Sequence, residues 1–588
     1  MVVQARAMEG TAKMENKSWS IAPAWPECRN AAQRLGVSPL VAQVLFNRGI
    51  MEPDRVRAFL DPKLSHLHAP ESLPGVTQAA ERIARAVRDR ESIVIYGDYD
   101  ADGLTGTAIL WHLLTLAGAR VSYYIPHRIE EGYGVNSDAI RQIRQDGADL
   151  LITVDCGITA VEQIRLARAL GLAVVITDHH AFEGTLPEAE VVVHPRAGEG
   201  YPNPDLCGAG VAFKLAWAAA KSLCGAEKVH SRFRDFLVDA TGLVALGTIA
   251  DVVPLTGENR VLARHGLTGL AKSKLTGIMA LIEAARLTDQ KLDSEHVGFW
   301  LAPRLNSAGR MADGELAAEL LTSATPERAR EIALLLERHN QERKSLERRI
   351  FDEACAMIEA RHLASDARRG IVLASENWHA GVIGIVASRV VERYRRPTII
   401  IALDSGQGQG SGRSIPHFEL NHALAECREH LIAFGGHAMA AGLRIAADRI
   451  ESFTAAFVAR ANQRLTAQDL EPTLRLDAET RLSELSEQTV QQIEQLAPFG
   501  QGNPRPKFAS GALQVDGEPR VMGASGEHLS FHLSDGHQRC RAVAFSQKDH
   551  LPALLQHRRC QVAFTPRLNT FRGCTNVEMQ VVDIRCPV

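Results

Sequence analysis

Short apolar runs alternate with amphipathic segments over residues 86–195. The runs are IVIY, VSYYIP, LLITV, LAVVIT and AEVVVHP, and most of the stretches between them have the spacing of a helix. Strands that are apolar on both faces are typical of a parallel sheet covered by helices on both sides. The pattern therefore predicts an α/β domain with an open parallel sheet, which we place at residues 86–265.

The distribution of Gly, Pro and charged residues divides the rest of the chain into further segments. From Pro326 to Leu363 the sequence is dense in charge and has no further glycine or proline, which predicts a long helix within a connector at residues 266–362. A second α/β pattern, from GIVLASE to FGGHAMAAGL, places a second domain at 363–467. Short alternating strands with Gly and Pro turns then predict a small barrel at 468–588. Residues 1–85 are expected to be a flexible lead-in followed by a small helical segment.

Composition narrows the class of protein. No apolar run approaches the roughly 18 residues of a membrane span, so no membrane association and a cytoplasmic location are expected. The ten cysteines contain no C-x-x-C pair, which argues against a zinc site or a disulfide framework. The net charge of −3 does not point to nucleic acid, but residues 501–588 hold 11 Lys and Arg against 7 Asp and Glu. A basic C-terminal module of this kind is compatible with nucleic-acid binding.

The stretch GDYDADG, at residues 97–103, places three aspartates directly after the first apolar run. Read as a calcium loop that begins at Asp98, it should carry a bidentate Glu at its twelfth position. That position is Ile109, and the stretch follows a strand rather than a helix. The EF-hand interpretation is therefore excluded, and another cation is needed to explain the charge.

Three further segments end in acidic or imidazole side chains. Asp155 follows LLITV, the triplet Asp178, His179 and His180 follows LAVVIT, and Asp251 follows the apolar run ALGTIA. Ligands of open parallel sheets bind beyond the carboxyl ends of the strands, and carboxylates gathered there repel one another unless cations neutralise them. Mixed carboxylate and imidazole ligands favour Mn²⁺ or Mg²⁺, and their number suggests a two-metal site for in-line attack on phosphorus.

Helix capping is the ordinary explanation for a single aspartate at the end of a strand. Asp178 fits that explanation, or it acts as a partner that orients His179. Capping explains neither D-x-D-x-D nor consecutive histidines. The four segments taken together therefore indicate metal chemistry.

The motifs DYDADG, VDCG, DHH and ADVVPL, in this order and setting, resemble the four motifs of the DHH phosphoesterases. These enzymes hydrolyse phosphate esters or anhydrides with two divalent metals. Further segments resemble the RecJ branch of the family, bacterial 5′→3′ exonucleases specific for single-stranded DNA: HRIEEGYG, RLNSAGRM, WHAGVIGIVASRVVERY, GSGRS, FGGHAMAAG and APFGQGNPRP. The likeness runs from about residue 30 to the C-terminus. It implies a DHH core, a DHHA1-type domain and an OB-like barrel.

The resemblance also assigns the metal site. It makes Asp155 the bridging ligand and leaves Asp98 and His180 as either ligands or contacts to the scissile phosphate. Other members of the wider superfamily have a metal-binding His where this chain has Tyr96, so the ligand at the first motif is either Tyr96 or Asp98. The implied ligands of two Mn²⁺ or Mg²⁺ ions, which with His180 form the catalytic set, are Asp100, Asp102, Asp155, His179 and Asp251.

Phosphate-binding residues are expected in the second α/β domain. Ser411 and Arg413 of GSGRS lie in a predicted glycine-flexible loop suited to a phosphate. His437 of FGGHAMAAG either begins an anion site at the N-terminus of a small-residue helix or lies in a tight turn. Arg128 is either a surface charge or, by the resemblance, part of a pocket for the 5′-terminal phosphate with Ser411 and Arg413. The resemblance adds three substrate contacts near the metals: Arg304, Asn306 and Arg310.

The implied function is a metal-dependent exonuclease that degrades single-stranded DNA from a 5′-phosphate to mononucleotides, in DNA repair and recombination. One alternative is a phosphodiesterase for short oligonucleotides or cyclic dinucleotides, although such enzymes are usually shorter and lack the barrel. The other is a non-catalytic DNA-binding replication scaffold, although these have typically lost metal ligands. We expect a monomer, and the resemblance implies single-stranded-DNA-binding protein and a RecQ-type helicase as partners. Five barrel phenylalanines are expected mainly in the core, and none is assigned to base stacking: Phe508, Phe531, Phe545, Phe564 and Phe571.

Overall fold

The structure, a computed structural model, describes residues 17–128, 130–182, 184–198, 200–226, 228–311 and 314–587. The predicted flexible lead-in spans residues 1–20, of which 1–16 lie outside the described residues, while 18–20 belong to a strand, Ser18–Ile21. The chain forms two compact units. Unit 2 comprises Pro62–Leu346 and Pro498–Pro504, and unit 1 comprises the chain up to Asp61, Glu347–Ala497 and the chain from Arg505 onward.

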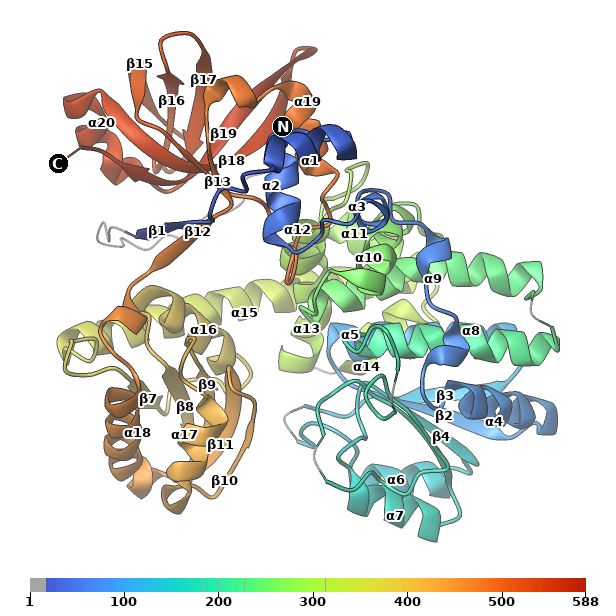
Figure 1. Ribbon diagram of the computed structural model, residues 1–588. Helices are drawn as coiled ribbons and strands as arrows, with labels where there is room; N and C mark the ends of the chain where they lie inside the picture. Colours follow the sequence, from blue (N-terminus) through green and yellow to red (C-terminus); the bar gives the residue numbers. More distant parts are fainter. Residues whose placement is uncertain are drawn as a thin grey trace. The chain divides into compact units, whose positions relative to one another are not determined.

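Unit 2 is built around a five-stranded parallel sheet in the order β3-β2-β4-β5-β6 (Figure 1). Ile93 and Ile95 face one side of this sheet, and Val94 and Tyr96 face the other, as the pleat of a strand requires. Both sides are apolar because both are covered by helices, which confirms the predicted architecture. The strands are β2 (Ser92–Gly97), β3 (Arg120–Tyr124), β4 (Leu150–Val154), β5 (Ala173–Thr177) and β6 (Val191–Val193).

Two groups of helices cover the sheet. The larger core lies between the sheet and α4 (Val76–Asp89), α5 (Ala101–Leu116), α8 (Gly208–Cys224) and α9 (Ser231–Ala250). The smaller core lies between the opposite side and α6 (Ser137–Gln145) and α7 (Val161–Ala169), which the ribbon shows below the sheet (Figure 1).

A run of helices follows the sheet. The last of them, α15 (Pro326–Ala360), is 35 residues long, which confirms the predicted long helix. The backbone N–H of Arg328 donates to the Thr325 hydroxyl, and this contact caps the first turn of α15. Among the described residues, every helix is too short or too polar to span a bilayer. The other members are α10 (Gly257–Leu270), α11 (Thr276–Ala284), α12 (Ser294–His296), a π-helical turn (Val297–Leu301), α13 (Ala302–Met311) and α14 (Gly314–Leu321).

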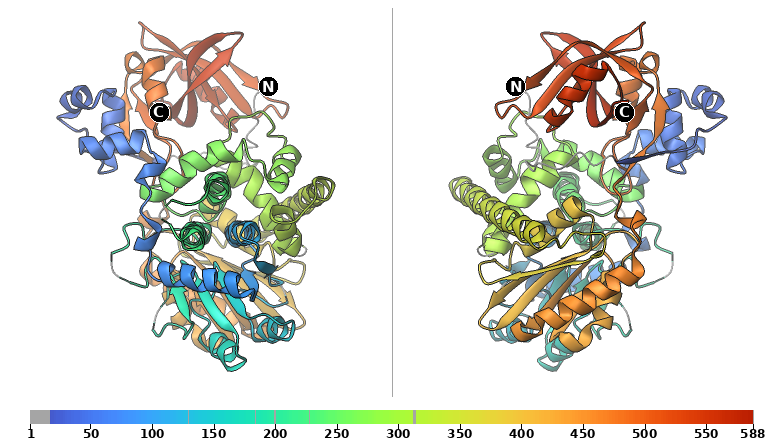
Figure 2. Two further views of the ribbon diagram at one scale, coloured as in Figure 1. Left: turned by 90° about the vertical axis from the view of Figure 1, so that its right-hand side faces the viewer. Right: turned by 90° about the vertical axis from the view of Figure 1, so that its left-hand side faces the viewer.

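Unit 1 contains a second five-stranded sheet in the order β10-β11-β9-β8-β7, in which only β7 and β8 are parallel. Its strands are β7 (Ile371–Ser375), β8 (Thr398–Asp404), β9 (Gln407–Arg413), β10 (Ala433–Gly436) and β11 (Ala440–Ala446). Its helices are α16 (Ile383–Tyr394), α17 (Leu420–Glu426) and α18 (Ile450–Arg464). Figure 2 shows this sheet with α18 from the side.

Two expectations for this second sheet are wrong. GSGRS belongs to strand β9 rather than to a flexible loop, because its alternate glycines make room for neighbouring side chains. A Cβ at Gly410 would lie 2.7 Å from the Leu443 side chain, and a Cβ at Gly412 would lie 2.7 Å from that of Leu420. FGGHAMAAG forms the antiparallel hairpin of β10 and β11 and contains no helix.

The chain ends of unit 1 also fold together. The N-terminal strand β1 (Ser18–Ile21) pairs in parallel with β12 (Thr473–Leu476), and three helices follow it. These helices are α1 (Cys28–Leu35), α2 (Pro39–Asn47) and α3 (Pro53–Leu60).

The predicted barrel is confirmed by strand pairing. The order β18-β15-β16-β17-β19, together with an additional pairing of β18 with β19, closes five strands into a ring. The ring strands are β15 (Leu513–Met522), β16 (His528–Ser534), β17 (Arg539–Ala544), β18 (Arg559–Phe571) and β19 (Cys574–Arg585), with α20 (Leu551–His557) between β17 and β18. Strands β13 (Ala478–Thr480) and β14 (Phe508–Ser510) flank it, and α19 (Glu487–Glu494) lies between them in sequence.

Candidate metal centre

The acidic segments of unit 2 meet at the carboxyl edge of its sheet. Asp98, Asp155 and Asp178 follow strands β2, β4 and β5, while Asp251 follows helix α9. Their side chains, with those of neighbouring motif residues, form three groups in which the potential ligand atoms lie within 4.8 Å of one another. The groups are Asp98, Asp100 and Asp155; Asp155, His179 and His180; and Asp102, His179 and Asp251. Asp155 and His179 each belong to two groups, so they lie at the middle of the cluster.

Three buried atoms of this cluster make no hydrogen bond. Nε2 of His179 lies 3.0 Å from Oδ1 of Asp155, and no hydrogen bond joins the two atoms. These two atoms and Oδ1 of Asp98 find no hydrogen-bond partner among the described residues. Because buried polar atoms almost always have a partner, atoms that converge in this way fit a shared cation.

The pKa values of the carboxyl groups lead to the same conclusion. Burial and the charge of Asp102 raise the pKa of Asp155 well above its usual range, and burial and Asp100 do the same for Asp98. Burial, with Asp100, raises the pKa of Asp102 to about 6, and burial, with Asp102, raises that of Asp251 to about 9. Cations would remove this repulsion, and a set of carboxylates with imidazole suits Mn²⁺ or Mg²⁺.

The backbone around Asp155 is shaped for close packing. Asp155 has a φ of 63°, in the left-handed region that a residue with a Cβ adopts only at a cost in free energy. Gly208, at the start of α8, lies so close that a Cβ there would be 2.6 Å from the Cβ of Asp155. The N–H groups of Gly208 and Ala209 donate to the two carboxylate oxygens of Asp102, at 2.6 and 2.9 Å. The sequence analysis missed this helix N-terminus, although CGAG before a long apolar helix is a signal for it.

Asp178 positions the histidine beside it. His180 Nδ1 donates to Oδ1 of Asp178 at 2.8 Å, and the same oxygen accepts the backbone N–H of His179 at 2.7 Å. Burial alone would raise the pKa of Asp178, but the hydrogen bond and charge of His180 hold it at about 2. Burial likewise opposes the charge on His180, yet Asp178 raises the pKa of His180 to about 9. Asp178 therefore orients the ring of His180, whereas the sequence analysis had considered it as a partner of His179.

Tyr133 is a second residue that the sequence analysis missed, although it belongs to the quoted motif HRIEEGYG. Its hydroxyl lies 3.1 Å from Nδ1 of His180 and donates to the backbone carbonyl of Asp155 at 3.2 Å. The side chain is 52% exposed, so it lies at the solvent-facing side of the cluster.

The two candidates for the first motif are separated by the structure. Asp98 belongs to one of the three ligand groups. Tyr96 is fully buried, and its hydroxyl donates to the carbonyl of Gly134 at 3.0 Å. Tyr96 therefore packs in the smaller core of unit 2, on the side of α6 and α7.

Three of the expected substrate contacts lie around the GDYDADG turn. The Arg128 guanidinium lies over the ring of Tyr99, 4.8 Å from its centre. Burial and Asp98 raise the pKa of Tyr99, and the charges of Arg128 and Arg310 oppose that rise. Asn306 accepts the backbone N–H of Ala101 at 2.7 Å, so it holds the turn in place.

Arg304 has different surroundings. Its side chain is buried and pairs with Glu337 of α15 at 2.6 Å, and it also donates to the carbonyl of Trp300. Arg304 therefore links α13 to α15, and we leave it out of the substrate contacts proposed below.

Comparison with known proteins identifies the family. Three family models match: the DHH family N-terminal domain at residues 92–248, the DHHA1 domain at 368–463 and the RecJ OB domain at 476–583. The chain is 36% identical over 570 residues to the single-stranded-DNA-specific exonuclease RecJ of Bacillus subtilis, covering 96% of this chain and 70% of that protein. This chain belongs to the RecJ family.

Other RecJ proteins agree with this assignment. RecJ of Escherichia coli is 33% identical and is matched over 92% of this chain and 95% of its own length. The crystal structure of Thermus thermophilus RecJ in complex with Mn²⁺ superimposes with a TM-score of 0.81, at 32% identity over 97% of this chain and 80% of that one. The Mg²⁺ complex of the same protein gives a TM-score of 0.76 at 31% identity, covering 97% of this chain and 79% of that one. These matches confirm the predicted fold class of two α/β domains with a C-terminal barrel.

The expected phosphate residues of this RecJ-family chain lie on strand β9 of unit 1. Arg413 Nη1 donates to the Ser411 hydroxyl at 3.2 Å. Both side chains lie against the first turn of α16, where a Cβ at Gly384 would be 2.9 Å from Oγ of Ser411 and 3.1 Å from Nη2 of Arg413. A guanidinium and a hydroxyl beside a helix N-terminus are suited to an anion.

His437 has no such setting. It lies in the turn between β10 and β11, where its backbone N–H donates to Ala440 at 2.8 Å. Of the two interpretations of FGGHAMAAG, the tight turn is confirmed and the helix N-terminus is wrong. Arg128 belongs to unit 2, so its grouping with Ser411 and Arg413 stays a prediction.

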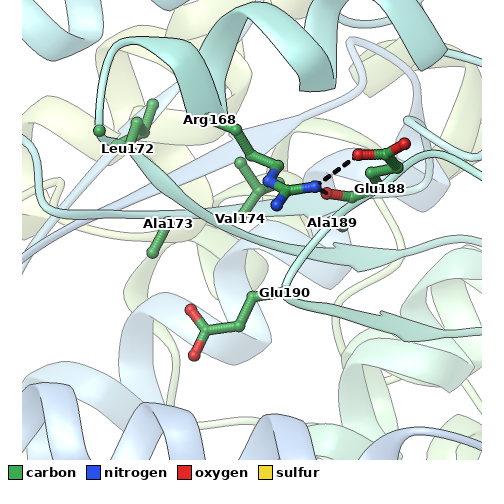
Figure 3. Close-up of a pocket in the computed structure, with 8 residues that line it drawn as sticks. Arg168, Leu172, Ala173, Val174, Glu188, Ala189 and Glu190 are labelled. Carbon is green, nitrogen blue, oxygen red and sulfur yellow. Dashed lines mark hydrogen bonds and ion pairs between the residues drawn. The ribbon is translucent and has the colours of Figure 1, made fainter.

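A separate hollow of about 430 Å³ lies at the start of β5, the end opposite to the metal cluster (Figure 3). Arg168 and Glu188 in its wall pair at 2.6 Å, and Glu190 is held by Arg82 and Arg85. Its charges neutralise one another, so it offers no group for the chemistry of the RecJ family.

Proposed function

We propose that this chain is a metal-dependent exonuclease that hydrolyses single-stranded DNA from its 5′ end to mononucleotides. The observation that carries the proposal is the cluster around Asp155 and His179, whose buried atoms converge without hydrogen bonds, in a chain of the RecJ family. The relatives named above are single-stranded-DNA-specific exonucleases. A non-catalytic scaffold is not favoured because every acidic motif is retained. A short-oligonucleotide phosphodiesterase is not favoured because the match to RecJ proteins includes the barrel.

The cluster would hold two divalent ions, Mn²⁺ or Mg²⁺, and the related Thermus structures are complexes with Mn²⁺ and with Mg²⁺. One set of ligands would be Asp98, Asp100 and Asp155, and the other would be Asp102, His179 and Asp251. The family resemblance makes Asp155 the residue that would be shared between the two sets. When bound, such a pair of ions activates a water molecule and neutralises charge on the phosphorus being attacked. Asp102 keeps its position because two N–H groups of α8 hold its oxygens.

Other side chains hold the scissile phosphate. His180 is oriented by Asp178, whose Oδ1 accepts its Nδ1–H at 2.8 Å, and is a proposed contact of a phosphate oxygen. The Tyr133 hydroxyl lies beside it and can donate to the same group. Arg310 is a further contact, and Asn306 keeps the aspartate turn in place through Ala101.

The polarity of cleavage comes from residues that recognise the 5′-terminal phosphate. We assign this role to Ser411 and Arg413, which lie beside the first turn of α16. Arg128 is included on the family resemblance alone. A terminal phosphate carries more charge than an internal diester, and a guanidinium fork discriminates between the two. In this arrangement residues 86–265 supply the chemistry, residues 363–467 recognise the end of the strand, and residues 266–362 join them.

The barrel at residues 468–588 binds the strand further along. OB-type barrels use their second and third strands and the hairpin of the last two strands. Here that hairpin joins β18 and β19, and its tip exposes 68% of Phe571, with Arg572 over the ring at 5.2 Å. Phe508, Phe531 and Phe564 are buried and Phe545 is half-buried against His528. Phe571 is the most exposed of the five, and we propose that it stacks on a base. The proposal also includes two partners, single-stranded-DNA-binding protein and a RecQ-type helicase. It further includes a monomeric state and a cytoplasmic location, and family membership supports all four.

The test is release of nucleotides from a long single strand labelled at its 5′ end. Label should appear as mononucleotide from the first time point with Mn²⁺ or Mg²⁺ and should not appear with a chelator. The matched duplex should be resistant, and a 3′-labelled strand should release its label last. Release of longer fragments, or of the 3′ label first, would exclude the proposed reaction.

A further inference from the structure

A seven-residue loop, Pro498–Pro504, belongs to a different unit from its neighbours in sequence. Helix α19 before it and strand β14 after it are parts of unit 1, yet the loop itself folds with unit 2 (the orange segment beside α12 in Figure 1). Its Phe499 carbonyl accepts a hydrogen bond from the Ser294 hydroxyl of α12. The chain of unit 1 therefore contributes one short segment to the unit that carries the metal cluster.

The loop is rigid by its own bonds. Gly500 and Asn503 exchange two backbone hydrogen bonds, at 2.9 and 3.1 Å. The Asn503 side chain is fully buried, and its Nδ2 donates to the carbonyl of Pro498 at 2.7 Å, which closes the loop. Gly502 has a φ of 70°, the left-handed conformation that glycine adopts without strain.

This loop packs on the segment that follows Asp251. The carbonyl of Gln501 accepts the N–H of Leu255 at 2.8 Å. On the other side of the same peptide unit, the carbonyl of Pro254 accepts Nδ2 of Asn259 at 3.1 Å. The Pro254–Leu255 peptide is thus held from both sides, once from α10 and once from the loop.

Between this fixed peptide and Asp251 lie only two residues, and the first is strained. Val252 has a φ of 62°, a genuine outlier for a β-branched side chain. Its side chain is 64% exposed, so packing of the side chain does not hold that conformation. Strained backbone persists only where the surrounding structure enforces it. On one side of the turn the Val252 N–H donates to the Ile249 carbonyl at the end of α9, at 3.3 Å, and on the other side the Pro254–Leu255 peptide is held by the loop and by Asn259.

We propose that the Pro498–Pro504 loop is a positioning element for Asp251, and that it sets the geometry of the metal site formed by Asp102, His179 and Asp251. The inference rests on the metal centre of the proposed function. The loop touches neither metal nor substrate, and it acts by fixing the turn that aims the Asp251 carboxylate. A displaced loop should therefore impair one metal site and leave the site of Asp98, Asp100 and Asp155 in place.

Three variants of the full-length protein displace the loop to different degrees. Gly502→Ala forces a side chain into the left-handed conformation and brings a Cβ to 3.0 Å from that of Pro254. Asn503→Ala removes the bond that closes the loop. Gly500→Ala is milder, because its Cβ would meet the flexible end of Leu255 at 2.8 Å. Gly511→Ala is the matched control, since its nearest contact is an ordinary 3.7 Å from Glu479.

The measurement is Mn²⁺ binding by calorimetry. The parent and Gly511→Ala should bind two ions, while Gly502→Ala and Asn503→Ala should weaken one of the two by about tenfold or more, the effect typical of residues that orient a ligand. In a protein that already carries Asp251→Asn, adding Gly502→Ala should cause no further loss of Mn²⁺ affinity. A general loss of stability would instead weaken Mn²⁺ binding in both backgrounds. The inference would be overturned if all three loop variants bound two Mn²⁺ ions with parental affinity. It would also be overturned if Gly502→Ala lowered Mn²⁺ affinity as much in the Asp251→Asn protein as in the parent. If the parent itself bound no Mn²⁺, the proposed metal centre would fail instead.

Discussion

Nε2 of His179 and Oδ1 of Asp155 lie 3.0 Å apart, and neither is hydrogen-bonded to the other. One atom follows β5 and the other follows β4, so the parallel pairing of these two strands brings them together. Neither buried atom has a hydrogen-bond partner among the described residues, so a cation beside them would satisfy both. The contact therefore marks the middle of the proposed two-metal site.

Asp155→Asn tests this assignment. The substitution keeps the size of the side chain and removes its charge, so it should reduce nuclease activity by more than about 100-fold, beyond the effect of residues that only orient a ligand. DNA binding should change little, because the residues proposed to grip the strand lie elsewhere. The checks are kcat/KM on a single strand and Kd for the same strand measured with a chelator present. Near-parental turnover would show that Asp155 is not a metal ligand.

The first motif is tested by a pair of substitutions. Tyr96→Phe removes the hydroxyl that donates to Gly134 and accepts from Nδ2 of Asn136, which should cost about 1–3 kcal/mol of unfolding free energy and leave Mn²⁺ binding unchanged. Asp98→Asn should weaken Mn²⁺ binding by at least about tenfold, because it removes a proposed ligand. Calorimetric titration of both proteins decides the point. The opposite pattern would make Tyr96 the ligand.

Much of the candidate site could be predicted from the sequence, because most of the proposed ligands follow a predicted strand and parallel strands end at the same edge of the sheet. The aspartates after β2, β4 and β5 follow apolar runs, and parallel strands carry their carboxyl ends to one edge whatever the rest of the fold does. Phe571 could not be distinguished from the buried phenylalanines, since its exposure depends on the length of one hairpin. Tyr133 was missed because only tertiary folding brings its loop to His180.

The errors have physical causes as well. Alternate glycines in GSGRS indicate flexibility in an isolated chain, but in this sheet they make room for Leu443 and Leu420 and form a strand. Arg304 was grouped with Arg310 because both belong to RLNSAGRM. Helix α13 turns one of them toward α15 and the other toward the Tyr99 side, and spacing alone does not reveal which.

Arg304→Gln tests the structural role that the fold gives this residue. Removing the guanidinium leaves the partly buried Glu337 carboxylate with the Gln341 amide and without a cation, so the protein should lose about 1–3 kcal/mol of unfolding free energy. The double variant with Glu337→Gln should recover part of that loss, because no unpaired charge remains. Denaturant unfolding of the single and double variants gives both values. A variant of parental stability with a raised KM for DNA would restore Arg304 as a substrate contact.

The polarity of cleavage is tested at Arg413. Its guanidinium lies with the Ser411 hydroxyl against the first turn of α16, an arrangement suited to the doubly charged terminal phosphate. Arg413→Ala should lower kcat/KM on 5′-phosphorylated strands by about tenfold or more, corresponding to roughly 1.4 kcal/mol of transition-state binding. Strands that end in a 5′-hydroxyl should be poor substrates for the parent and should be affected much less. Arg444→Ala, on the neighbouring strand β11, is the control, because its guanidinium is exposed and donates to Gln407. The decisive comparison is kcat/KM on both kinds of strand for the parent, Arg413→Ala and Arg444→Ala. An equal drop on both strands with Arg413→Ala would mean that Arg413 contributes general affinity and that the 5′ end is recognised elsewhere.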